Sequence, residues 1–186
     1  MATGLARKTW SVEEYEEMIE KGILDKNDHV ELIRGEIVNM TPIGMQHAAC
    51  VTILSSLFYE LVGAKATISV QNPVLLLNHS EPQPNIALLS EPPRAYVRRR
   101  PTSTDIILLV VVSDTTLKTD RRVKVPLYAE AGVPEVWIVN LEEDAIEVYT
   151  KPEGGQYGKM HSVGRGGTVN LPGGLPGSVR VDEVLG

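Results

Sequence analysis

The sequence predicts an α/β or α+β domain with one central mixed β-sheet. The predicted order over the first 150 residues is a helix, a hairpin, then helix–strand–strand–strand–helix–strand and a second hairpin, a mixture typical of a sheet that helices cover. Residues 106–112 (IILLVVV) are apolar at every position, as expected for a central strand that is covered on both faces. Ten of the 16 glycines lie at or after residue 154, so residues 152–186 should form short strands and turns rather than helix.

The N-terminal part is predicted to form a helix and then a hairpin. Residues 11–14 read SVEE, a capping box in which the glutamate carboxylate accepts a hydrogen bond from the serine amide. Four apolar side chains share one helical face, namely Val12, Tyr15, Met18 and Ile19. Extended runs at 30–33 and 36–40 flank a glycine-containing dipeptide at 34–35, which predicts a β-hairpin.

The middle of the chain supplies the predicted sheet and the helices that cover it. The predicted strands are 66–77, 85–90, 106–112, 135–139 and 145–149, and the predicted helices are 46–62 and 120–131. The second, third and fourth of these strands should be neighbours, with the two helices packed against them. Pro126 lies inside the second helix, so it should either kink that helix or mark a later start.

Composition excludes several classes of protein. Lys and Arg number 18 against 24 Asp and Glu, and a net charge of −6 argues against a surface that coats nucleic acid, although a local basic patch is compatible with it. The single cysteine, Cys50, excludes a disulfide framework and a multi-cysteine zinc site, and its apolar neighbours favour a buried position. The longest purely apolar run is far short of the ~20 residues of a bilayer span, and the first ten residues contain no apolar core. We therefore expect a cytoplasmic protein with no membrane partner.

Common catalytic motifs are absent from the sequence. It contains no glycine-rich dinucleotide loop, no Walker loop, no His-Glu-x-x-His and no Gly-x-Ser-x-Gly. The four histidines are widely scattered, and no spacing supports a nucleophilic triad built on Ser113. A combination of distant segments carries a stronger signal.

Six such segments share their pattern with one known family. They are 31–38 (ELIRGEIV), His47 at a helix start, 81–89 (EPQPNIALL), 108–117 (LLVVVSDTTL), 120–124 (DRRVK) and 127–139 (LYAEAGVPEVWIV). Together they resemble the Uma-two family of restriction-endonuclease-like proteins, which carry a variant PD-(D/E)XK nuclease core. The resemblance runs from about residue 9 to the end of the chain, and its most specific parts are 113–117 and 127–139. It implies one restriction-endonuclease-like domain over residues 1–186: a mixed central sheet flanked by helices, with an N-terminal helix and hairpin and a turn-rich β tail.

The resemblance also implies a chemistry, the hydrolysis of DNA phosphodiesters. Such a reaction uses a divalent cation, Mg²⁺ or Mn²⁺, to activate water and to neutralise charge on the phosphate. In the variant core the motif lysine moves from a strand to the following helix; Lys124 matches the helix position and Ser113 matches the strand position. Glu31 and His47 match polar positions that the family places near the same cleft, which makes Glu31 a candidate metal ligand.

The sequence departs from the family pattern at two catalytic positions. Asn85 stands where the family has aspartate before an apolar strand, and Val111 stands where it has glutamate in the central strand. The amide oxygen of Asn85 is still a candidate metal ligand, whereas valine offers no donor atom, and a hard dication prefers anionic oxygens. The resemblance therefore implies an endonuclease-like protein with impaired catalysis.

Two further aspartates are expected in the same cleft. Asp114 and Asp120 lie close to these positions in the sequence, although neither matches a missing ligand. Asp120 is explained equally well as the N-cap of the helix that starts there.

Two basic clusters are candidates for contacts with nucleic-acid phosphates. The first contains Arg94, Arg98, Arg99 and Arg100, and the second contains Arg121, Arg122 and Lys124. Phosphate contact and a solvated surface explain them equally well.

Three functions fit these observations. The protein could be an active metal-dependent endonuclease with a rearranged ligand set, which the presence of Lys124 favours. It could be a DNA-binding module that does not hydrolyse DNA, which the arginine clusters favour. It could also be an interaction protein that uses the fold as a scaffold, for example as a homodimer, which the acidic net charge favours.

Overall fold

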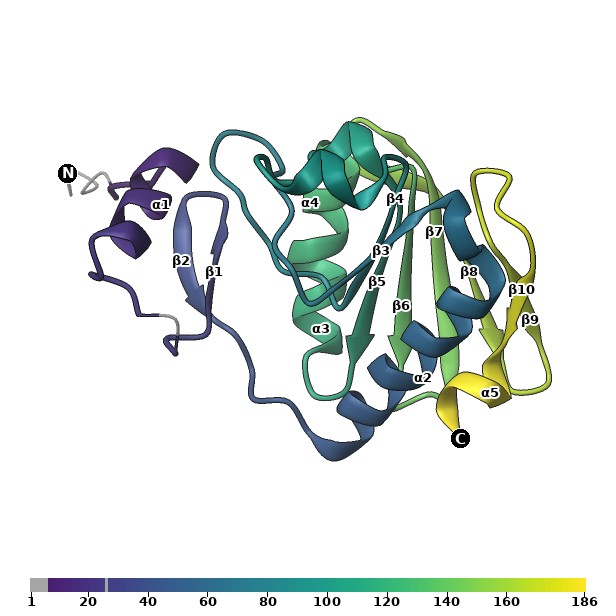
Figure 1. The fold of residues 1–186 in the computed structure, drawn as a ribbon. Helices are drawn as coiled ribbons and strands as arrows, with labels where there is room; N and C mark the ends of the chain where they lie inside the picture. The colour runs from purple at the N-terminus through teal and green to yellow at the C-terminus, as the bar shows by residue number, and fades with distance from the viewer. Residues whose placement is uncertain (1–6, 26) are drawn as a thin grey trace.

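A six-stranded mixed sheet forms the centre of the fold (Figure 1). The computed structural model describes residues 7–25 and 27–186. The strands follow one another in the order β3 (Thr67–Val70), β4 (Ile86–Leu89), β5 (Ile106–Ser113), β6 (Glu135–Asn140), β7 (Ala145–Glu153) and β8 (Gln156–Gly164). Within this sheet β5 and β6 pair in parallel, and the other neighbours are antiparallel. The predicted class and the predicted adjacency of 85–90, 106–112 and 135–139 are confirmed.

Strand β3 is shorter than the predicted strand at 66–77. Its pairing with β4 stops at Val70, because the next residue, Gln71, has a positive φ of 51° and turns the chain out of the ladder. At the other end of the sheet, β7 extends four residues beyond the predicted 145–149 and forms a long hairpin with β8.

Strand β5 is the centre of two apolar layers. Leu108, Val110 and Val112 point to one layer, whereas Leu109 and Val111 point to the other, as the two-residue period of a strand requires. Val110 is 0% exposed and Val111 is 4% exposed. The prediction of a central strand covered on both faces is therefore confirmed.

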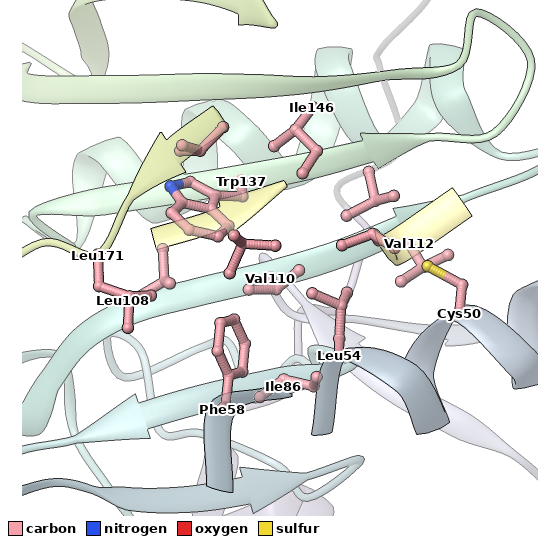
Figure 2. Close-up of a cluster of buried hydrophobic side chains, with 14 of the residues drawn as sticks. Cys50, Leu54, Phe58, Ile86, Leu108, Val110, Val112, Trp137, Ile146 and Leu171 are labelled. Atoms are coloured by element: carbon pink, nitrogen blue, oxygen red, sulfur yellow. The ribbon is translucent and has the colours of Figure 1, made fainter. Parts of the chain in front are cut away.

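Helix α2 (Met45–Val62) covers the first layer (Figure 2). Its inward residues Leu54 and Phe58 pack on β5 and β6, and the Phe58 ring lies 6.1 Å from the ring of Trp137 between centroids. Cys50 lies in the same layer and is 3% exposed, and burial raises the pKa of its thiol to about 12. The expected core position of this cysteine is confirmed.

The C-terminal tail completes this layer. It contains the two-stranded sheet of β9 (Thr168–Asn170) and β10 (Ser178–Arg180), followed by the short helix α5 (Val181–Leu185). The expectation that the tail forms no helix is wrong for these last residues. Val181 and Val184 are buried against α2, and this packing stabilises a helix of only five residues.

The second layer is covered by a helix that changes its winding. It begins as α3 (Leu117–Thr119), widens into the π-helical turn η4 (Asp120–Lys124) and continues as α4 (Val125–Glu130). Pro126 has no amide hydrogen and would clash with the carbonyl group of Arg122 in a regular α-helix, and the wider turn before it accommodates both effects. The prediction that this helix starts at residue 120 is wrong, so Asp120 is not an N-cap.

The N-terminal helix and hairpin form a third, smaller packing unit. Helix α1 (Val12–Glu20) has the predicted capping box, with Ser11 N donating to Glu14 Oε2 at 2.9 Å and Glu14 N donating to Ser11 Oγ at 3.2 Å. Strands β1 (Val30–Ile33) and β2 (Glu36–Asn39) form the predicted hairpin. Its turn requires Gly35, because the φ of this residue is 80° and a Cβ atom there would lie 2.7 Å from Thr9 Cβ.

Candidate active-site pocket

A pocket of about 1010 Å³ lies between the β1–β2 hairpin, the start of α2, the β4 and β5 strands and the π-helical turn. Seven of the residues singled out from the sequence line it: Glu31, His47, Asn85, Val111, Asp114, Asp120 and Lys124. The first and last of these residues, Glu31 and Lys124, are 93 positions apart in the sequence, and the fold brings all seven to one cavity.

Glu31 and Lys124 form a buried ion pair in the wall of this pocket. Lys124 Nζ lies 2.9 Å from Glu31 Oε1, and their side chains are 18% and 6% exposed. The other carboxylate oxygen, Oε2, accepts a hydrogen bond of 3.0 Å from the backbone amide of Gln83. Both oxygens of Glu31 are therefore engaged by protein donors.

The backbone fixes the hairpin that carries Glu31. The amide of Glu81 donates to the Leu32 carbonyl at 2.7 Å, and Arg34 at the hairpin turn forms an ion pair of 2.8 Å with Glu130 of α4. Glu31 thus faces Lys124 because its strand is anchored on both sides. The π-helical turn positions Lys124 from the opposite wall.

Asn85 crosslinks β5 and α2. Its Oδ1 accepts a hydrogen bond of 2.7 Å from the backbone amide of Val112, and its Nδ2 lies 3.1 Å from His47 Nε2. A backbone amide can only donate, so the amide oxygen of Asn85 faces Val112 and its NH₂ group faces the histidine. His47 Nε2 therefore accepts this hydrogen bond, and the ring carries its proton on Nδ1.

This arrangement favours a neutral imidazole. Burial lowers the pKa of His47, although the carboxylates of Asp114 and Asp120 oppose the shift. His47 Nδ1 is buried and has no hydrogen-bond partner among the described residues. A protonated ring would need an acceptor at Nε2, where it meets the NH₂ group of Asn85.

Val111 adds an apolar surface at the position where the resemblance to the Uma-two family implies a carboxylate. It lies on the pocket side of β5, on the opposite face from Val110 and Val112. A glutamate at this position would point toward the pocket, since side chains alternate strictly along a strand.

The residues present do not fit a divalent cation. Val111 has no donor atom, the Asn85 oxygen already accepts from Val112, and both oxygens of Glu31 are engaged. Over residues 7–25 and 27–186, no group of three or more His, Cys, Asp or Glu side chains is placed to hold a metal ion. Oxygen-seeking cations such as Mg²⁺ bind through carboxylates and water, and the carboxylates are missing at this point.

Ser113 and Asp120 form a closed cluster beside the pocket. Ser113 Oγ donates to Asp120 Oδ2 at 2.7 Å, and Thr116 Oγ1 donates to the same oxygen at 2.6 Å. Ser113 is completely buried, so its hydroxyl does not face the pocket. Asp114 directly follows β5, and its carboxylate reaches the start of α2, where Oδ2 would lie 3.3 Å from a Cβ atom on Gly44.

The arginine clusters are partly engaged by carboxylates. Arg99 forms two hydrogen bonds with Asp105, at 2.6 and 2.8 Å, and Arg100 pairs with Glu16 and Glu81. In the second cluster Arg121 pairs with the buried Glu147.

Arg98 and Arg122 differ from these three arginines. Neither of the two is among the arginines that form ion pairs within the part of the chain that the structure describes. Arg121 and Arg122 line a smaller pocket of about 330 Å³ that shares Thr115 with the large one. The proposed phosphate contacts thus fall on separate surfaces, with the second cluster next to the large pocket.

Sequence reasoning missed the network around Glu147. This carboxylate is 1% exposed and accepts hydrogen bonds from Arg121 Nε at 3.1 Å, Asn140 Nδ2 at 3.0 Å and Tyr149 at 2.6 Å. Burial alone would raise the pKa of Glu147, but these three donors lower it. The available signal was a single charged residue in the otherwise apolar strand segment 145–149.

Comparisons with known proteins agree with this fold. A family model described as "Uma2: Putative restriction endonuclease" matches residues 12–182. The fold is similar to the crystal structure of a putative nuclease of the DUF820 group from Anabaena variabilis ATCC 29413, with a TM-score of 0.70 and 13% identity, over 94% of this chain and 97% of that chain. No curated protein matches the chain.

Proposed function

Since this chain belongs to the Uma2 family of restriction-endonuclease-like proteins, we propose that it is a nuclease-fold protein whose metal-dependent DNA cleavage is impaired. One observation carries this proposal: Asn85 and Val111 occupy the positions where the family resemblance implies the two motif carboxylates. The Asn85 amide is already engaged, because its oxygen accepts a hydrogen bond from the Val112 amide and its NH₂ group donates to His47. A divalent cation, where such enzymes bind one, activates water and neutralises the phosphate.

The remaining residues of the pocket do not replace this chemistry. His47 Nε2 accepts from Asn85, so its lone pair is not available to take a proton from water. Glu31 is held by Lys124 and by the Gln83 amide, so it is likewise occupied. Lys124 keeps a positive charge that can contact a phosphate oxygen, but it activates no nucleophile while it remains paired.

The charge of the pocket limits its affinity for DNA. Its lining contains the carboxylates of Glu31, Glu36, Asp114 and Asp120 against the ammonium group of Lys124. A phosphate that enters without a counter-ion is repelled by this excess of negative charge. We expect DNA binding, where it occurs, to be weak and to involve the exposed arginines near the pocket.

Plasmid cleavage tests the proposal on the wild type, Asn85→Asp, Val111→Glu and the double variant, with Mg²⁺ or Mn²⁺ and with a chelator. We expect no cleavage by the wild type, little by either single variant and chelator-sensitive cleavage by the double variant, because only the double variant restores both carboxylates. Asn78→Asp is the matched control, since it adds the same charge at an exposed position outside the pocket. Robust chelator-sensitive cleavage by the wild type that Lys124→Ala abolishes would overturn the proposal.

The alternative is a non-catalytic module that binds either DNA or another protein. Replacing Arg122 distinguishes these two possibilities. Arg122 lies beside the pocket without an ion-pair partner among the described residues, so Arg122→Ala should weaken DNA binding equally for all sequences. The slope of log affinity against log salt should flatten by about 0.9 per lost phosphate contact. Equal affinity in wild type and Arg122→Ala would argue for a protein-interaction role instead.

A further inference from the structure

One buried carboxylate, that of Asp120, differs from the others in having no cationic partner. Five carboxylates are buried among the described residues: Glu31, Glu81, Asp105, Asp120 and Glu147. Four of them form ion pairs, in which Glu31, Glu81, Asp105 and Glu147 bind, in this order, Lys124, Arg100, Arg99 and Arg121. Asp120 is 3% exposed and forms no ion pair over residues 7–25 and 27–186. A buried charge that no cation offsets is costly, so this carboxylate favours a positively charged partner.

The hydroxyl cluster around Asp120 engages only one of its two carboxylate oxygens. Ser113 Oγ and Thr116 Oγ1 both donate to Oδ2, and no described residue donates to Oδ1. Asp120 lines the large pocket, and its Oδ1 is not among the fully enclosed side-chain atoms that lack a partner, so a molecule in the pocket can reach this oxygen. The two hydroxyl groups are neutral, so they orient the carboxylate without cancelling its charge.

The surroundings of Asp120 add negative charge and no free cation. Burial lowers the pKa of His47, and the carboxylates of Asp114 and Asp120 oppose this shift, so both carboxylates lie near that ring. The ring is neutral, because its Nε2 accepts from the Asn85 side chain. Lys124 is the one lysine or arginine among the described residues that line the pocket, and Glu31 engages it. This end of the pocket therefore attracts cations and repels anions.

The pocket wall on the same elements is apolar. Val123 belongs to the same π-helical turn as Asp120, lines the pocket and is 36% exposed. Val111 lines the pocket from β5, and Ile43 lines it from the segment before α2 with 58% of its surface exposed. The pocket volume of about 1010 Å³ exceeds by far what a single ion fills. A ligand that uses the whole pocket combines a positive charge with an apolar body.

We propose that this pocket binds a small organic cation, whose primary ammonium group pairs with Asp120 Oδ1 and whose apolar body lies against Val111, Val123 and Ile43. An ammonium group supplies both the hydrogen-bond donor and the positive charge that this oxygen lacks among the described residues. A divalent metal fits less well, since no group of three or more His, Cys, Asp or Glu side chains in the described part of the chain is placed to hold one. The inference rests on the proposed function, because it requires a pocket without a divalent cation.

Calorimetric titration in the presence of a chelator tests the ligand class with hexylamine, hexanol and hexanoate, which share one apolar body. The wild type should bind hexylamine saturably, and it should bind the alcohol and the carboxylate at least about tenfold more weakly, because only the amine is positively charged. Methylammonium should also bind more weakly than hexylamine, since it has almost no apolar body. A wild type that does not bind hexylamine, or that binds hexanol equally well, would overturn the proposal.

Asp120→Asn tests the residue, because asparagine keeps an oxygen for the Ser113 and Thr116 hydroxyls and removes the charge. This variant should bind hexylamine about tenfold more weakly or worse, while its affinity for hexanol stays unchanged. Asp144→Asn is the matched control, since it removes the same charge at an exposed position outside the pocket, and it should bind like the wild type. Circular dichroism checks that both variants are folded. Equal affinity for hexylamine in the wild type and Asp120→Asn, or an equal loss in both variants, would overturn the proposal.

Titration of Mg²⁺ into the same proteins separates this inference from the proposed function. If the wild type binds neither Mg²⁺ nor hexylamine, the inference is wrong and the proposed function stands. Saturable Mg²⁺ binding by the wild type that Asp120→Asn abolishes would show that a metal pairs with this carboxylate, and would overturn both.

Discussion

Two buried glutamates, Glu31 and Glu147, are each held by a cation from the same π-helical turn. Lys124 pairs with Glu31 in the wall of the large pocket, and Arg121 pairs with Glu147 of β7. Glu147 also accepts from Asn140 and Tyr149, while Glu31 accepts in addition from the Gln83 amide. The Glu147 carboxylate is enclosed by side chains, whereas the Glu31 carboxylate borders an open cavity.

This difference distinguishes an ion pair that only stabilises the fold from an ion pair that borders a candidate ligand site. The Glu147 network satisfies its members internally and ties the helix to β6 and β7, so it needs no ligand. The Glu31 pair lines the same pocket as the apolar Val111 and as His47, whose Nδ1 has no partner among the described residues. Buried charge alone therefore does not identify the functional region; the cavity beside it does.

The largest effect is expected from Arg121→Ala. It leaves Glu147 buried without its cation and should lower the free energy of unfolding by about 2–3 kcal/mol, less than for a fully enclosed pair because Arg121 is 38% exposed. Urea denaturation measures this loss. Arg122→Ala in the same turn is the matched control and should cost less than about 0.5 kcal/mol. Equal losses in both variants would contradict the structural role of the pair.

A smaller loss is expected from Lys124→Met. Glu31 then keeps only the Gln83 amide, and the free energy of unfolding should fall by about 1–2 kcal/mol because the pocket admits water to the carboxylate. Adding Glu31→Gln should recover part of that loss, since it removes the unpaired charge. If the double variant is as unstable as the sum of the two single variants, the ion pair is not what holds these side chains.

The smallest effect on stability is expected from Asn85→Asp, and it is best seen as a pKa change. In the wild type, burial holds the pKa of His47 below its ordinary value, so the unfolded chain binds a proton more readily and stability should fall as pH drops below about 6.5. A carboxylate at residue 85 can accept from a protonated ring and should raise this pKa. The stability change on acidification should then weaken or reverse in sign.

NMR titration of the histidine ring signals measures this shift. His161 is exposed and distant in the sheet, so its signal serves as the internal reference. An unchanged His47 pKa in Asn85→Asp would show that the side chain of residue 85 does not control the protonation of this ring.

Local patterns predicted much of the fold. The doubly apolar run at 106–112 predicted the central strand, and the capping box at 11–14 predicted the start of α1, because burial and capping follow from neighbouring residues. Pro126 was harder to interpret, since a proline can end, kink or follow a π-helical turn, and tertiary packing decides among these outcomes. The short helix α5 depends entirely on its contacts with α2.

The sequence predicted which residues line the candidate site, but it did not predict the hydrogen bonds among them. The family pattern indicated Glu31, Lys124, Asn85 and Val111, and all four line the pocket. The bridge from Asn85 to Val112 and His47 joins residues 27 and 38 positions apart, and no local pattern encodes such a distance. Ser113 lies on the same face of β5 as Val111, but it is buried, and its hydroxyl donates to Asp120 rather than facing the pocket.

Calorimetric titration of Mg²⁺ or Mn²⁺ into the wild type and into the Asn85→Asp, Val111→Glu double variant tests the central claim most directly. The wild type should show no saturable heat at metal concentrations that saturate the double variant, because its two motif positions carry an engaged amide and a valine. Saturable metal binding by the wild type that Glu31→Gln abolishes would show that this pocket holds a metal through another set of ligands, and would contradict the account.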